Sequence, residues 1–101
     1  NFERDNINLK NCLFRELNQN TSKINPNSQI EGFLGEGIKE NIPFWSKAGL
    51  MSQVRHDAAW WENKNSCKTL LVVFCTGSDF AQDNLFLPQL SKEIYESNIS
   101  Y

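Results

Sequence analysis

Apolar residues recur at helical spacing near the N-terminus, at intervals of three and four: Leu9, Cys12, Leu13 and Leu17. This pattern predicts an amphipathic helix over residues 5–18, in which Asp5 or Asn6 accepts the first free backbone N–H groups. Residues 18–41 are rich in Asn, Ser and Gly, which favour turns over regular structure. We therefore expect a long irregular connection there, with a short helical turn near residues 35–40.

Three strand-like runs follow, at residues 45–54, 58–62 and 69–76. The third run is almost wholly apolar, so we expect it to be covered on both faces. The polar residues 63–66 are short enough for a hairpin loop between the second and third runs. These features predict a three-stranded antiparallel meander.

The C-terminal part has a second helical pattern, with one apolar face made of Phe80, Leu87, Leu90 and Ile94. Ser78 is the predicted N-cap of this helix. Pro88 either kinks it or lies in the first turn of a new helix, because proline is disfavoured in a helix interior. The whole pattern predicts an α/β (α+β) fold, in which a meander lies between an N-terminal helix and a C-terminal covering helix.

Composition and charge exclude some classes of function. A chain of 101 residues buries one modest core, so residues 1–101 are expected to form a single unit. The net charge of -2, with Lys and Arg dispersed among acidic residues, argues against a nucleic-acid partner. The longest apolar run, residues 70–75, is far shorter than the ~20 residues of a membrane span.

Cysteine and histidine residues give no metal-site pattern. The three cysteines lack C-x-x-C spacing and are expected to be reduced thiols: Cys12, Cys67 and Cys75. His56 is the single histidine, without partners at metal-ligand spacing. Neither a metal nor a cofactor is therefore expected.

Residues 45–49 (WSKAG), followed by residues 55–59 (RHDAA), resemble the Lys-Thr-Gly strand and the next, Arg-x-Asp strand of class A β-lactamases and penicillin-binding proteins. The resemblance covers most of the chain and corresponds to the C-terminal portion of such a serine hydrolase. It implies that other strands and a helical half lie upstream, and that the run at residues 70–75 pairs with that missing N-terminal part. A small-molecule or peptide-like acyl substrate, such as a β-lactam, is implied.

The resemblance also implies roles for the Lys-x-Gly strand. Lys47 would bind the substrate anion and help to deprotonate the serine. Gly49 would let an amide-containing substrate approach as an added strand. The backbone N–H of Leu50 would be one oxyanion-hole donor. Ala48 replaces the usual Ser or Thr and lacks its hydroxyl, which weakens carboxylate binding by about 1 kcal/mol.

Arg55 is implied as a second cation for the substrate carboxylate, and Trp45 lies beside Lys47 as a cleft residue. The residues themselves leave other interpretations open. Lys47 could be a solvated lysine on an edge strand, and Arg55 with Asp57 a surface ion pair. The three tryptophans could be core residues: Trp45, Trp60 and Trp61.

The S-x-x-K and S-D-N motifs needed for acylation occur nowhere in residues 1–101. We therefore expect these residues alone to be inactive, with the serine nucleophile supplied from upstream. Two alternatives remain: a small non-catalytic binding module whose Trp-rich sheet meets a protein partner, or a catalytically dead member of the hydrolase family. The pattern assigns no cellular location.

Overall fold

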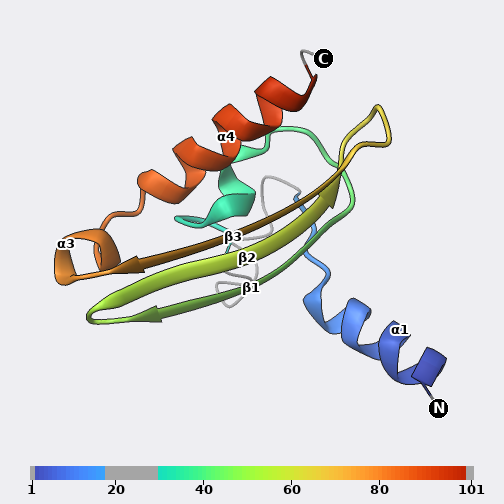
Figure 1. The fold of residues 1–101 in the computed structure, drawn as a ribbon, viewed down its shortest axis with the longest axis horizontal. Coiled ribbons are helices and arrows are strands. Elements are labelled where there is room, and N and C mark those ends of the chain that lie inside the picture. The colour runs from blue at the N-terminus through green and yellow to red at the C-terminus, as the bar shows by residue number, and fades with distance from the viewer. Residues whose placement is uncertain (1, 18–29, 100–101) are drawn as a thin grey trace.

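The computed structural model describes residues 2–17 and 30–99. Three antiparallel strands form one sheet in the order β1-β2-β3, as the sequence predicts (Figure 1). In chain order, the elements are α1 (Phe2–Leu13), η2 (Leu34–Gly37), β1 (Phe44–Met51), β2 (Val54–Glu62), β3 (Lys68–Thr76), α3 (Ser78–Ala81) and α4 (Phe86–Ile99). The expected α+β fold is confirmed.

The first hairpin turns earlier than predicted. Met51 pairs with Val54, so the turn lies at residues 52–53 and β2 already includes Arg55 and Asp57. The prediction that the second strand starts at residue 58 was wrong. The error has a physical cause, because Arg55 and Asp57 are buried polar residues at alternate positions and do not give the apolar alternation of a half-buried strand.

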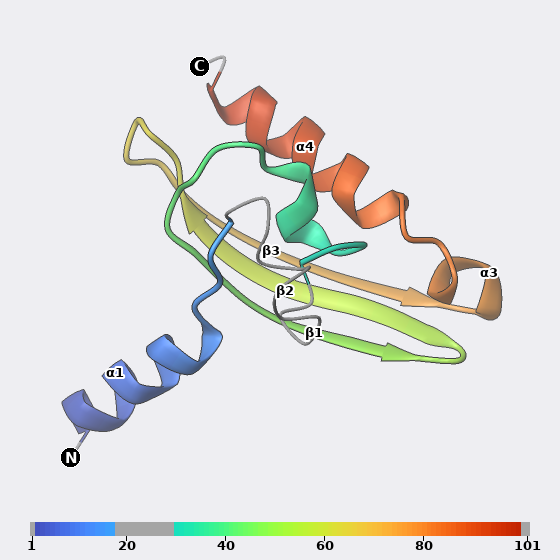
Figure 2. The ribbon, with the colours of Figure 1, turned by 180° about the vertical axis from the view of Figure 1, so that it is seen from behind.

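The sheet has an inner face, covered by η2 and α4, and an outer face turned away from them (Figures 1 and 2). The inner face carries Phe44, Ser46, Ala48, Arg55, Asp57, Ala59, Trp61, Leu71, Val73 and Cys75. The outer face carries Trp45, Lys47, Gly49, His56, Ala58, Trp60, Leu70, Val72 and Phe74. Leu70 and Phe74 are each 73% exposed, so the described part of the chain does not cover β3 on both faces as predicted.

The core lies between the inner face and α4. Phe44 and Trp61 are cross-strand partners, and their rings stack with centroids 6.0 Å apart. Leu34 of η2 and Leu87 of α4 are fully buried against this layer. Gly37 brings η2 so close to α4 that a side chain at this position would overlap the α4 backbone, so the joint requires glycine.

The C-terminal pattern forms two helices. Pro88 lies in the first turn of α4, where its missing N–H costs no helical hydrogen bond, which confirms the second of the two predicted possibilities. Asp83 precedes this helix and accepts hydrogen bonds from the N–H groups of Leu85 and Phe86. Ser78 is the first residue of α3 and Gly77 is its N-cap, so the prediction of Ser78 as N-cap was wrong.

Helix α1 spans Phe2–Leu13, a shorter and earlier range than the predicted 5–18, and only its C-terminal end lies near β1 (Figure 1). Leu17 lies outside the helix and joins the core, whereas Leu9 of the predicted apolar face is exposed. The predicted irregular connection is confirmed over residues 30–43, where η2 forms the helical turn; residues 18–29 lie outside the described range. No helix in the described ranges is long and apolar enough to span a membrane.

Candidate functional site

The Lys47-Ala48-Gly49 segment lies in the middle of β1, at the edge of the sheet. Lys47 is opposite Ala58, and its side chain is exposed on the outer face. Its ammonium Nζ donates a hydrogen bond to the Ala48 carbonyl oxygen at 2.7 Å. A cation therefore lies against a backbone acceptor of the edge strand.

The edge of β1 is closed at one end by the segment that follows α1. Phe14 forms an antiparallel bridge with Trp45, and the Arg15 N–H donates to the Phe44 carbonyl at 2.8 Å. The Phe44 carbonyl therefore points away from β2. Past Ser46, no described strand pairs with this edge.

The remaining edge exposes alternate backbone groups. The register of β1 with β2 is continuous from Phe44 to Met51, without a bulge. In an antiparallel pair the N–H and C=O of one residue point to the same side, and successive residues alternate. Because Phe44 points away from β2, Ser46, Ala48 and Leu50 do so as well. The Leu50 N–H thus lies on the open edge.

Gly49 has a structural reason to be glycine. A Cβ at this position would overlap the His56 ring, which lies across from it on β2. The His56 ring also contacts Phe74 of β3, with centroids 5.4 Å apart. Close approach of His56 therefore accounts for Gly49 in addition to the predicted need for substrate access.

Arg55 lies on the inner face, opposite Leu50, and is only 7% exposed. Its Nε donates to the Ala81 carbonyl at 2.9 Å and its Nη1 to the Gly32 carbonyl at 2.8 Å. The guanidinium also stacks over the Phe33 ring at 4.8 Å. Lys47 and Arg55 thus lie on opposite faces, and the structure does not bring together the two cations that were predicted to share an anion.

Asp57 lies beside Arg55 on the inner face and is 1% exposed. Its Oδ2 accepts the Leu34 N–H at 3.0 Å, whereas its Oδ1 has no hydrogen-bond partner among the described residues. Burial raises the pKa of the Asp57 carboxyl to about 6, against the lowering effects of the Leu34 and Ala58 backbone N–H groups and of the Arg15 and Lys47 charges. The alternative of a surface ion pair between Arg55 and Asp57 is wrong, because both are buried and the described ion pairs do not include them.

Comparison with known families assigns most of the chain to one family. Residues 6–97 match the β-lactamase enzyme family. The chain belongs to this family. No curated protein matches the chain. Family membership supports a β-lactamase-like hydrolase function in general terms, and it agrees with the resemblance carried by residues 45–49 and 55–59.

In this β-lactamase family member, an aromatic cluster flanks the Lys47 segment. Trp45 and Trp60 stack on the outer face with centroids 4.8 Å apart, and the Phe14 ring meets Trp45 edge-on at 5.9 Å. The Lys10 ammonium lies over both tryptophan rings, at 4.8 and 5.0 Å. Trp61, in contrast, belongs to the core. Sequence reasoning missed Lys10 and Phe14, because only tertiary contact brings α1 to Trp45.

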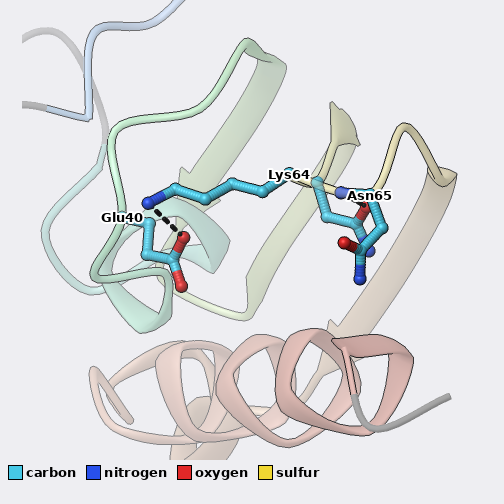
Figure 3. Close-up of polar contacts among 4 residues, drawn as sticks. Glu40, Lys64 and Asn65 are labelled. Atoms are coloured by element: carbon cyan, nitrogen blue, oxygen red, sulfur yellow. Dashed lines mark hydrogen bonds and ion pairs between the residues drawn. The ribbon is translucent and has the colours of Figure 1, made fainter.

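A second polar cluster lies at the far end of β2 from Arg55. Lys64 forms an ion pair with Glu40 at 3.1 Å (Figure 3). Asn63 Oδ1 accepts the N–H groups of Asn65 and Cys67 at 2.9 and 3.0 Å, which closes the hairpin loop. Burial and the nearby Glu40 carboxylate raise the pKa of Tyr95 in α4 to about 12. This cluster joins the hairpin to α4 and is remote from Lys47 in the sheet.

The cysteines take no part in the site. All three are free, as predicted: Cys12, Cys67 and Cys75. Cys75 is buried in β3, and burial raises the pKa of its thiol, which disfavours the reactive thiolate. Among the described residues, no group of His, Cys, Asp and Glu is arranged to hold a metal ion.

Proposed function

We propose that β1 is the substrate-binding edge of a β-lactamase-like serine hydrolase, used for acyl transfer on a β-lactam or peptide-like amide. The observation that carries the proposal is the open edge of β1, which presents the Leu50 N–H and the Ala48 backbone groups next to the Lys47 ammonium. An extended amide can add to such an edge as a further strand. The Phe14–Trp45 bridge limits that addition to the part of the edge beyond Ser46.

Lys47 would bind the substrate carboxylate. Its side chain is exposed and forms no ion pair with a described carboxylate, so its charge is available to a ligand. A substrate N–H that donates to the Ala48 carbonyl would displace Nζ from that oxygen. The same event would free the ammonium to turn toward the anion and to assist the serine.

Leu50 would act through its backbone N–H as an oxyanion donor. Removal of one such donor typically costs about 3 kcal/mol of transition-state stabilisation. Gly49 leaves the strand backbone accessible, whereas Ala48 offers no hydroxyl to the substrate carboxylate. Loss of that neutral hydrogen bond is worth about 1 kcal/mol.

Arg55 and Trp45 have supporting parts in the proposal. Arg55 lies behind Leu50 and adds positive potential there. It would contact the substrate carboxylate directly only after releasing the Gly32 or the Ala81 carbonyl. Trp45 supplies an apolar wall at the closed end of the edge, held in place by Trp60.

The proposal requires a serine nucleophile from sequence outside residues 1–101, because S-x-x-K and S-D-N are absent within them. Binding can be tested on the chain itself by titrating benzylpenicillin and following backbone amide NMR signals. We expect the largest shifts at Ala48 and Leu50, and their loss in Lys47→Gln. Lys68→Gln removes another exposed lysine, on β3, and is the matched control. Equal shifts in both variants, or none at the edge of β1, would contradict the proposal.

A non-catalytic binding module is the second candidate, favoured by the exposed apolar row on β3: Leu70, Val72 and Phe74. Mass spectrometry separates it from the enzyme. A protein that combines these residues with S-x-x-K and S-D-N should gain the mass of penicillin covalently. If no adduct forms despite an intact S-x-x-K motif, a binding module or a dead family member is the better description.

A further inference from the structure

The residues 32–37 loop, which contains η2, is fixed to the inner face by side chains. The Gly32 N–H donates to Glu36 Oε1 at 3.2 Å, and its carbonyl accepts from Arg55 at 2.8 Å. Gly32 has a φ of 82°, a left-handed conformation that favours glycine. Its backbone polar groups are therefore satisfied by two charged side chains from different elements.

Leu34 is held in the same way from two sides. Its N–H donates to Asp57 Oδ2 at 3.0 Å, and its carbonyl accepts from Ser91 Oγ at 2.6 Å. A buried backbone N–H without a hydrogen-bond partner costs free energy, so the Leu34 N–H requires an acceptor at the position of Asp57. The loop is thus clamped between β2 and α4 through the peptide groups of Leu34.

The residue of β2 that holds Leu34, Asp57, lies on the strand that pairs with β1. Asp57 is the cross-strand partner of Ala48, and Arg55 is the partner of Leu50. Ala48 and Leu50 are the residues whose backbone groups face the open edge. Because the backbone groups of Ala48 and Leu50 point away from β2, these residues form non-hydrogen-bonded pairs with Asp57 and Arg55. A shift of the Asp57 side chain would therefore reach Ala48 through side-chain packing across the pair.

The Asp57 carboxyl is poised to change its protonation state. One oxygen, Oδ1, is buried without a partner among the described residues, and burial raises the pKa to about 6. The charged groups that act on it are Arg15 from the segment after α1 and Lys47 from β1. Arg55 on its own strand and Glu36 on the loop instead bind Gly32. A charged acceptor binds an N–H more strongly than a neutral one does.

We propose that Asp57 is a positioning residue for the β1 edge: as an ionised acceptor of the Leu34 N–H, it holds the residues 32–37 loop behind Ala48, and its protonation loosens that hold. The consequence for catalysis depends on the proposed function, because it concerns the edge that would bind substrate. The structural part depends only on the hydrogen bond between Leu34 and Asp57 and on the register of Ala48 with Asp57.

The test is a pH titration of the ligand-free chain from pH 4 to 8, followed by amide NMR. We expect the Leu34, Ala48 and Leu50 signals to shift together with a midpoint near the Asp57 pKa of about 6. The protection factor of the Leu34 amide against local opening should fall about tenfold below the midpoint, even though global stability rises there, because a neutral carboxyl accepts the N–H more weakly. In Asp57→Asn the fold is kept, because an amide oxygen still accepts the Leu34 N–H, but the titration should disappear at all three amides.

Asp79→Asn is the matched control, since Asp79 is an exposed carboxylate in α3. The titration should be unchanged in it. A Leu34 signal without a midpoint near 6, or one that persists in Asp57→Asn, overturns the proposal. If the Leu34 signal shifts with pH but the Ala48 and Leu50 signals do not, Asp57 only anchors the loop. That outcome overturns the positioning role. Because no penicillin is used, a failure to bind penicillin contradicts the proposed function and leaves this result standing.

Discussion

The inner and outer faces of the sheet come from the same three strands but use polar residues in opposite ways. On the inner face, Arg55 and Asp57 are buried and bind backbone groups of the residues 32–37 loop. On the outer face, Lys47 of β1 is exposed, and so are Leu70 and Phe74 of β3 on the far side of β2. Polar residues thus hold the fold together on one face, and on the other they are left available for binding.

The difference shows that burial, and not residue type, separates structural residues from candidate functional ones. A buried charge must be satisfied, or the fold loses several kcal/mol. An exposed lysine contributes little to stability and can change partners freely. Substitutions on the inner face should therefore affect folding, and those at the β1 edge should affect binding.

The largest effect is expected at the tryptophan pair that spans the two faces. Trp61→Ala should lower the free energy of unfolding by about 4 kcal/mol, because its ring is fully buried against Phe44. Trp60→Ala, on the outer face, should cost about 1 kcal/mol, the value of its stacking on Trp45. Urea denaturation measures both. If both variants lost the same unfolding free energy, the two faces of the sheet would not differ in their contribution to stability.

Two glycines, one packed against α4 on the inner side and one on the outer face, test the same difference between the faces, because each is in close contact with a neighbouring residue. Gly37→Ala should cost about 3 kcal/mol, because the new methyl group would overlap the backbone of Pro88 and the Ser91 hydroxyl in α4. Gly49→Ala should cost less, about 1 kcal/mol, because the overlapping atoms belong to the His56 ring, which can rotate. Thermal unfolding of the double variant Gly49→Ala with His56→Ala should recover most of that loss. If it does not, the His56 ring is not what crowds Gly49.

The pH dependence of stability should report the buried carboxyl of the inner face. The pKa of Asp57 rises from 3.8 to about 6 on folding, so the folded state binds the proton more tightly. The stability contributed by the protonated form is fully present below pH 3.8 and is lost as pH rises through about 6, on the order of 2–3 kcal/mol. Urea denaturation between pH 4 and 7 should show this slope, and Asp57→Asn should flatten it. An unchanged slope in Asp57→Asn would mean that other groups cause it.

The parts of the fold that follow from local pattern were predictable from the sequence. The apolar run of β3 depends on spacing alone, and proline chemistry reduced the place of Pro88 to two possibilities, a kink or the first turn of a new helix, of which the second is found. The apolar pattern missed the start of β2, because Arg55 and Asp57 are polar and look like loop residues. Only the resemblance of residues 55–59 to an Arg-x-Asp strand placed them in a strand. Nor could an all-apolar run show that Leu70 and Phe74 face away from the core, since it has no alternation.

The candidate site also has residues that the sequence could predict and residues that it could not. Lys47, Gly49 and Leu50 could be selected from the sequence because the resemblance depends on a short contiguous motif. That Arg55 would turn to the inner face was not visible, because a two-residue periodicity assigns a face only when the register is known. The contact of Lys10 with Trp45 joins segments more than thirty positions apart, and no local signal marks it.

The smallest effect on stability is expected at the apolar row of β3. Phe74→Thr should change the free energy of unfolding by less than about 0.5 kcal/mol, because the Phe74 side chain is mostly exposed and threonine suits a strand. Exposed apolar side chains on an edge strand promote association, so the same substitution should reduce self-association in analytical ultracentrifugation at high concentration. Glu93→Thr, on the exposed side of α4, is a control that should leave association unchanged. A large loss of stability in Phe74→Thr would mean that the outer face also holds the fold, and the division between a structural and a binding face would have to be abandoned.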